Sequence, residues 1–235
     1  MSSIIQDYFS QPKDYIDAYN KYINKKQNKK FENTKRKESK EEEIEASIYK
    51  SEIDKYNFLK LKLKDMLKNT LEYSEQEWQI EISKIVLLLF PKYFLFIDKL
   101  SIETNEGKRK ELDIVLIDTT GNIDIIEIKK PQDSGILSGK YRNNYKPSSQ
   151  LSGTIIQTEK YIYHLNTTAK KSEEKIKKKI LETKNLDLEI HIRNPKGIII
   201  MGRTKGLERE QLRDFEIIKR QYNNIIDIMM LVYIL

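Results

Sequence analysis

Hydrophobic and polar positions alternate with two different periods along this chain. Between residues 47 and 73, apolar side chains return every three or four positions, which predicts an amphipathic helix used for packing or oligomerisation. The next segment, SEQEWQIEISKIVLLLFPKY, keeps that spacing, with Ser74 and Glu77 placed as an N-terminal capping box and Pro91 placed to end the helix. From residue 93 onward, short apolar runs bounded by turn-forming residues predict β-strands.

The order of these segments predicts the fold class. Strands that alternate with helices late in a chain favour a mixed sheet flanked by helices, so we predict an α/β fold with an N-terminal helical region. The expected elements after the helix that starts near Ser74 are a strand at 93–102, a hairpin at 111–131, a loop at 132–149, one or two helices within 149–185, a strand at 195–203, a helix at 206–224 and a strand at 225–235.

A change in composition divides the chain near residue 70. Residues 1–70 are expected to form a helical and highly charged region, and residues 71–235 to form the main domain. The stretch from Asn24 to Glu45 is nearly free of apolar residues, with its basic part first and its acidic part second. We interpret this stretch as either a solvated helix or a disordered linker.

Composition narrows the chemistry that the chain can perform. It has 235 residues, 43 Lys and Arg against 36 Asp and Glu, and a formal net charge of +7. This basic excess favours a polyanionic partner such as nucleic acid, although a solvated lysine-rich surface would look the same. The lack of cysteine excludes disulfides and cysteine-bound zinc, and the only histidines are His164 and His191. Attention therefore falls on Asp, Glu and Lys.

Two further expectations concern location. No apolar run approaches the roughly 20 residues that a membrane-spanning helix needs. The first residues also lack the pattern of a secretory signal peptide. We therefore expect a cytoplasmic protein without a membrane partner.

The hairpin ELDIVLIDTTGNIDIIEIKKP carries charges among its apolar residues. Side chains alternate between the two faces of a strand, so Glu127 and Lys129 share one face. A three-residue loop at 120–122 would place Asp113 opposite Lys129 and diagonal to Glu127, whereas a loop with an even number of residues would place Asp113 on the other face. The pattern therefore permits a cluster of Asp113, Glu127 and Lys129 on one face of the sheet.

Such a cluster is costly to bury unless it has a partner. Two carboxylates on a face lined by Ile and Val favour a hard divalent cation such as Mg²⁺, which binds one or two carboxylates and keeps several waters. This kind of site can activate a water for attack on a phosphodiester, with Lys129 positioning the water or stabilising the phosphate. The alternative is an exposed edge hairpin with a surface Glu–Lys pair.

The hairpin has the D-x(n)-E-x-K pattern of the PD-(D/E)xK nuclease superfamily. Three segments in order, DIVLIDTTGNIDIIEIKKP, YRNNYKPSSQLSGTIIQTEKYI and GIIIMGRTKGLEREQLRDF, resemble more narrowly the nuclease domain of the Shedu family of anti-phage defence proteins. The resemblance runs from about Ser74 to the end of the chain, and so implies that residues 71–235 are a nuclease domain with a PD-(D/E)xK-like mixed sheet. Residues 1–70 carry no such resemblance.

The resemblance implies a Mg²⁺-dependent DNA endonuclease, with Mn²⁺ able to replace Mg²⁺, that forms a homo-oligomer (a dimer or tetramer) and serves in bacterial immunity. Asp113 and Glu127 match the metal ligands, the carbonyl of Ile128 matches a third ligand, and Lys129 matches the catalytic lysine. The family often has Pro before this Asp, where this chain has Leu112. A protein of nuclease-like fold that binds nucleic acid or assembles without catalysis is the alternative.

Further candidates lie on the helices. Nucleases of this superfamily often place a Glu on the helix before the sheet, and of Glu75, Glu77 and Glu81 we favour Glu75, because it lies closest to the apolar stripe of that helix. A solvated carboxylate at the helix N-terminus is the other reading. Gln157 and Tyr161 lie one helical turn apart, match a Q-x-x-x-Y feature of the resemblance, and would face the metal site, where Gln157 would orient water or phosphate. The other reading of Gln157 is a partly buried structural side chain.

The segment YRNNYKP lies in the expected loop. Lys140, Arg142 and Lys146 are candidates for phosphate contacts, and Tyr141 or Tyr145 is a candidate for stacking on a base. A solvated loop would have the same composition.

Overall fold

The computed structural model describes residues 40–104, 106–131, 135–204 and 206–231. The chain forms two units with a boundary between Thr70 and Leu71. Helix α3 (Lys40–Lys68) belongs to the first unit and carries the helical spacing seen in the sequence. Most of the charged stretch that begins at Asn24 lies outside the described residues, and its last six residues begin α3.

The helix predicted at Ser74 is confirmed with both of its ends. After a short 3₁₀ turn, η1 (Thr70–Glu72), helix α4 spans Glu75–Leu89. The Ser74 hydroxyl accepts from the backbone N–H of Glu77, and the Glu77 carboxylate accepts from the backbone N–H of Ser74, which satisfies two donors that would otherwise be free. The helix stops before Pro91, and its apolar stripe of Trp78, Ile82, Ile85 and Leu89 is buried.

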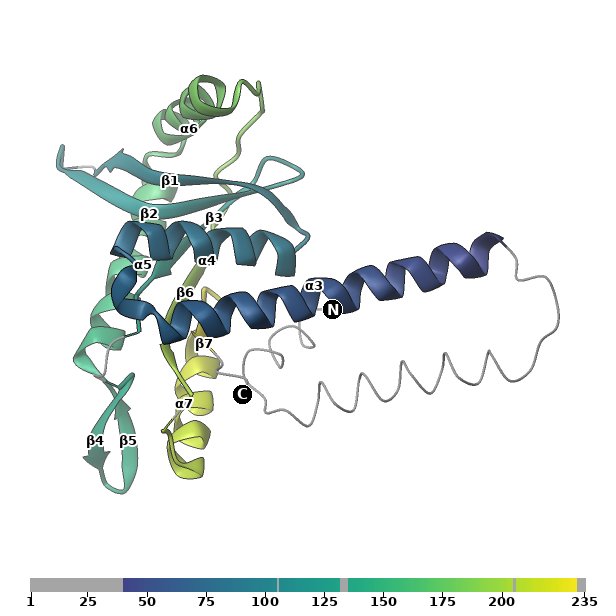
Figure 1. The fold of residues 1–235 in the computed structure, drawn as a ribbon. Helices are drawn as coiled ribbons and strands as arrows, with labels where there is room; N and C mark the ends of the chain where they lie inside the picture. Colours follow the sequence, from purple (N-terminus) through teal and green to yellow (C-terminus); the bar gives the residue numbers. More distant parts are fainter. Residues whose placement is uncertain (1–39, 105, 132–134, 205, 232–235) are drawn as a thin grey trace. The chain divides into compact units, whose positions relative to one another are not determined.

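A five-stranded mixed sheet forms the centre of the second unit (Figure 1), as the sequence predicts. Its order is β1-β2-β3-β6-β7. The pairs β1–β2 and β2–β3 are antiparallel, and β3–β6 and β6–β7 are parallel. Strand β3 is therefore central and buried on both faces. The bounds are β1 Tyr93–Glu103, β2 Arg109–Asp118, β3 Ile123–Ile128, β6 Gly197–Arg203 and β7 Ile226–Leu231.

Residues 132–149 are not all loop, and that expectation was wrong. Strands β4 (Leu137–Tyr141) and β5 (Asn144–Pro147) pair as an antiparallel hairpin and form a separate two-stranded sheet. The sequence contains no Asn-Gly or Asp-Gly turn at this point, which is the usual signal for a short hairpin.

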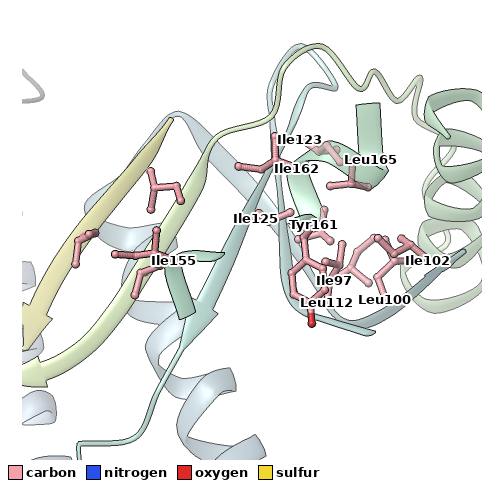
Figure 2. Packing of buried hydrophobic residues seen from close by; sticks show 14 of the residues in the cluster. Ile97, Leu100, Ile102, Leu112, Ile123, Ile125, Ile155, Tyr161, Ile162 and Leu165 are labelled. Atoms are coloured by element: carbon pink, nitrogen blue, oxygen red, sulfur yellow. The ribbon is translucent and has the colours of Figure 1, made fainter. Parts of the chain in front are cut away.

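Three helices complete the second unit: α5 (Ser149–Thr167), α6 (Ala169–Lys184) and α7 (Arg209–Tyr222). The region 149–185 therefore forms two helices. Side chains of α5 and α6 pack with β1, β2 and β3 in one hydrophobic cluster. Figure 2 shows Tyr161 of α5 among Ile97, Leu112 and Ile125 of this cluster. Among the described residues, no helix combines the length and the apolar character that crossing a bilayer requires.

The β2–β3 turn sets the register of the whole site. The N–H of Asp118 donates to the carbonyl of Asn122 at 3.0 Å, which leaves a three-residue loop at 119–121. The odd loop length keeps the face that the sequence predicts, but the loop lies one residue earlier than the predicted 120–122. The reason is local: the Asp118 carboxylate accepts from the N–H groups of Thr120 and Asn122 and fixes the turn there.

Gly121 in this turn leads to a stability prediction. It has φ +79°, and a Cβ placed on it would lie 2.1 Å from the backbone oxygen of Glu189, which cannot move aside cheaply. Gly107 has a similar φ of +75° with no atom within 4 Å of such a Cβ. We expect Gly121→Ala to lower the free energy of unfolding by about 3 kcal/mol and Gly107→Ala by only about 1 kcal/mol. Urea unfolding measures both, and equal losses would show that crowding at Glu189 contributes nothing.

Candidate active site

Two carboxylates meet between the middle of β2 and the end of β3. Val115 pairs with Ile125 and Ile114 with Ile126, and extending this register by one step places Asp113 directly opposite Glu127. The predicted opposition of Asp113 and Lys129 is therefore wrong by two positions along β3, because the turn lies one residue earlier. Because the shift is an even number of positions, Asp113 stays on the same face of the sheet as Glu127, and the two carboxylates still lie side by side.

Glu127 is buried on a central strand. Its relative exposure is 3%, and the residues on either side of it, Ile126 and Ile128, are buried too. An exposed edge hairpin with a surface Glu–Lys pair, the alternative interpretation of the sequence, is therefore wrong. A carboxylate in this position needs compensating donors or cations.

Lys129 provides a compensating cation for the buried Glu127 carboxylate. Its Nζ donates to Glu127 Oε1 at 2.5 Å and lies 3.9 Å from Asp113 Oδ2. Its backbone N–H donates to the carbonyl of Ile200 on β6, so the residue stays attached to the sheet beyond the end of β3. Burial alone would lower the pKa of Lys129, but the hydrogen bond and charge of Glu127, with the charge of Asp113, raise it above its usual value. The ammonium is thus held in its charged form.

Gln157 and Tyr161 of α5 reach the same carboxylate. Gln157 Nε2 donates to Glu127 Oε1 at 3.4 Å and to the Tyr161 hydroxyl oxygen at 2.7 Å. Burial raises the pKa of Tyr161, which stays a neutral phenol. The two side chains one turn apart on α5 therefore face the carboxylates, on the side that the sequence predicts.

The sequence did not identify Gln79 of α4. Its Nε2 donates to Asp113 Oδ2 at 3.0 Å and to the carbonyl of Ile128 at 3.3 Å, and the residue is buried. The favoured residue, Glu75, lies one turn earlier and is exposed; its Oε1 accepts from the backbone N–H of Lys130 at 3.3 Å. Gln79 lies on the same side of α4 as Glu75, and only its position next to the apolar stripe could have indicated it.

The site carries more negative charge than positive charge. Burial, and then the negative charge of Glu127, raise the pKa of Asp113 to about 6. Two carboxylates against one ammonium leave a net charge of about −1 when all three groups are ionised. Half-buried negative charge without full compensation is a feature of cation sites and active sites more often than of purely structural clusters.

The site has oxygen donors of the kind that a small divalent cation binds. Asp113 Oδ2 and the Ile128 carbonyl already converge on one donor, Gln79 Nε2, so a cation could contact both from nearly the same place. In the described part of the chain, no group of three or more His, Cys, Asp or Glu side chains is placed to hold a metal ion. Two carboxylates and one carbonyl nevertheless suit Mg²⁺, which keeps several of its own waters.

Comparison with known protein families shows which family this chain belongs to. The family model described as Shedu protein SduA, C-terminal, matches residues 72–231. The chain belongs to the Shedu family. The matched range contains every residue of the site described above and the whole five-stranded sheet, and α3 lies outside it. Membership of the Shedu family points to a role in anti-phage defence.

No curated protein matches the chain at a significant level. The assignment to the Shedu family therefore rests on the family model.

Proposed function

We propose that this Shedu chain is a Mg²⁺-dependent DNA endonuclease that hydrolyses phosphodiester bonds in anti-phage defence. The observation that carries the proposal is the meeting of Asp113, Glu127 and Lys129 on one face of the sheet, with Glu127 3% exposed on a central strand. A structural role alone gives no reason to place a buried and a half-buried carboxylate beside one ammonium. The family and the basic net charge of +7 support DNA as the substrate.

Asp113, Glu127 and the Ile128 carbonyl would hold the metal. When bound, Mg²⁺ supplies positive charge that neutralises the scissile phosphate and eases ionisation of the attacking water. Mn²⁺ would bind the same oxygen ligands.

Lys129 acts as a fixed cation in this scheme. Its raised pKa keeps it charged, so it donates hydrogen bonds and does not act as the general base. It would stabilise the negative charge that builds on the phosphate oxygens during attack. Gln157, held by the Tyr161 hydroxyl oxygen, would orient water or a phosphate oxygen beside Glu127. Glu75, at the outer edge of the site, would influence Lys129 through its charge, which contributes to the raised pKa of that lysine.

The test uses supercoiled and linear plasmid with the purified chain. With Mg²⁺ or Mn²⁺ we expect nicked and then linear or fragmented DNA, and with EDTA we expect intact DNA. DNA that is bound but never cut with any divalent ion would refute the nuclease proposal and favour the second candidate, a DNA-binding or assembly protein without catalysis. The mass in solution from light scattering tests the proposed dimer or tetramer.

A further inference from the structure

The β4–β5 hairpin is a two-stranded ribbon that pairs with neither edge of the main sheet. In Figure 1 it projects from the start of α5 and lies beside α7. Its sequence from 137 to 147, LSGKYRNNYKP, contains three basic residues and no acidic residue. The ribbon therefore presents positive charge on a thin element that lies outside the main sheet.

The half of the ribbon next to its turn is fixed to α7, through Tyr145 and its partner Lys140. The backbone N–H of Tyr145 donates to Asp214 Oδ2 at 2.9 Å, and Asp214 is buried. Lys140 Nζ forms an ion pair with Glu210 at 2.6 Å and lies over the Tyr145 ring. These contacts hold the ribbon in one direction and neutralise the charge of Lys140. The charge that remains available belongs to Arg142 and Lys146.

The tip of the ribbon exposes a cation and an aromatic ring together. Tyr141 is 61% exposed, and the guanidinium carbon of Arg142 lies 5.4 Å from the centre of its ring. Arg142 and Lys146 are exposed, and neither forms an ion pair with a carboxylate in the part of the chain that the structure describes. Their charges are thus free to attract an anion.

The backbone conformation of the turn gives no reason for an arginine at position 142. Tyr141 pairs with Asn144, and the two residues between them, Arg142 and Asn143, have φ of +47° and +65°. Both central positions of such a two-residue turn favour Asn or Gly, and a long side chain in the left-handed region costs about 1 kcal/mol. Arg142 is therefore unfavourable for the backbone, and its side chain must supply any advantage of having arginine there.

We propose that the ribbon enters the major groove of duplex DNA, with Arg142 and Lys146 on phosphates at its rims. This inference rests on the proposed function and specifies how the substrate is held. The major groove is about 12 Å wide and accepts a two-stranded ribbon. Along α5, Gln157 lies about 12 Å from Ser149, and the ribbon adds about 15 Å. One turn of duplex is about 34 Å long, so the same duplex reaches the active site and the ribbon.

The test compares two arginine-to-asparagine variants. Arg142→Asn removes one charge and places a residue that the turn prefers, so the melting temperature should stay equal or rise. Arg193→Asn is the matched control, because Arg193 is also exposed and also precedes an Asn with positive φ, Asn194. Both variants are titrated in EDTA against a labelled duplex of about 30 base pairs, which is about three helical turns.

Arg142→Asn should bind the duplex about tenfold more weakly, with a salt slope smaller by about one, while Arg193→Asn binds like the parent. Dimethyl sulfate should show protection of guanine N7, a major-groove atom, by the parent and less protection by Arg142→Asn. Equal affinity of the two variants, or a variant that alters only the mass of the assembly, would overturn the inference. Binding is measured without a divalent ion and so does not depend on cleavage. A chain that binds the duplex but never cuts it would refute only the nuclease proposal.

Discussion

Lys129→Met is expected to slow Mg²⁺-dependent plasmid cleavage about a thousandfold, because it removes the cation that stabilises charge on the phosphate. Lys129 Nζ lies 2.5 Å from Glu127 Oε1 and 3.9 Å from Asp113 Oδ2, so no other described lysine replaces it in this position. Removal of a positive charge also leaves the carboxylates more attractive to a cation. The variant should therefore bind Mn²⁺ at least as tightly as the parent while failing to cut.

The neighbouring Lys130→Met is the matched control for this experiment. The Lys130 ammonium donates to the backbone carbonyl of Tyr73 and not to either carboxylate, so cleavage should stay within a fewfold of the parent. Lys129→Met leaves buried Glu127 without its ammonium partner, which costs stability in the absence of metal. Circular dichroism in saturating Mg²⁺ checks that the variant is folded. A folded Lys129→Met protein that cuts at the parent rate would remove Lys129 from the mechanism.

Asp113→Asn is expected to abolish cleavage, to weaken Mn²⁺ binding about a hundredfold, and yet to stabilise the metal-free protein. The metal loses a charged ligand, which explains the first two effects. The third follows from the pKa of Asp113, which burial and then Glu127 raise from 3.8 to about 6. A raised carboxyl pKa means that the folded state holds the proton more tightly, so ionisation of Asp113 costs folding free energy.

Because ionisation of Asp113 lowers the stability of the folded state, the gain from Asp113→Asn depends on pH. The cost of the ionised carboxyl is fully present above about pH 6 and disappears as the pH falls to about 4. Without metal, Asp113→Asn should therefore gain about 1–2 kcal/mol over the parent at pH 8 and nothing at pH 4. Glu111→Gln is the control, because Glu111 is an exposed carboxylate two positions earlier on β2, and its charge contributes less to the raised pKa of Asp113 than burial and Glu127 do. A gain that does not depend on pH, or one equal to that of Glu111→Gln, would contradict the burial argument.

The shared face of Asp113 and Glu127 was predictable because side chains alternate strictly along a strand. A shift of the turn by one residue changes the pair sum by two and leaves every side chain on the same face. The register was not predictable, because it depends on Asp118 accepting hydrogen bonds from two N–H groups of the turn. Local turn chemistry of this kind has several solutions in one sequence.

Gln79 and the β4–β5 ribbon were missed for different reasons. A neutral glutamine near the start of a helix is ordinary, and its role appears only when β2 and β3 bring the Asp113 carboxylate and the Ile128 carbonyl to it. In the ribbon, the positive φ of Arg142 opposes its residue preference, so a propensity argument predicts a loop there. In both cases the tertiary structure outweighs the local signal.

The proposed metal site is tested most directly by anomalous X-ray scattering from crystals of this chain soaked in Mn²⁺. The proposal predicts one strong peak within about 2.5 Å of an oxygen of Asp113, an oxygen of Glu127 and the Ile128 carbonyl, with Gln79 Nε2 moved away from at least one of its two acceptors. A soaked crystal that binds Mn²⁺ only elsewhere, with Gln79 still donating to Asp113 and Ile128, would contradict it.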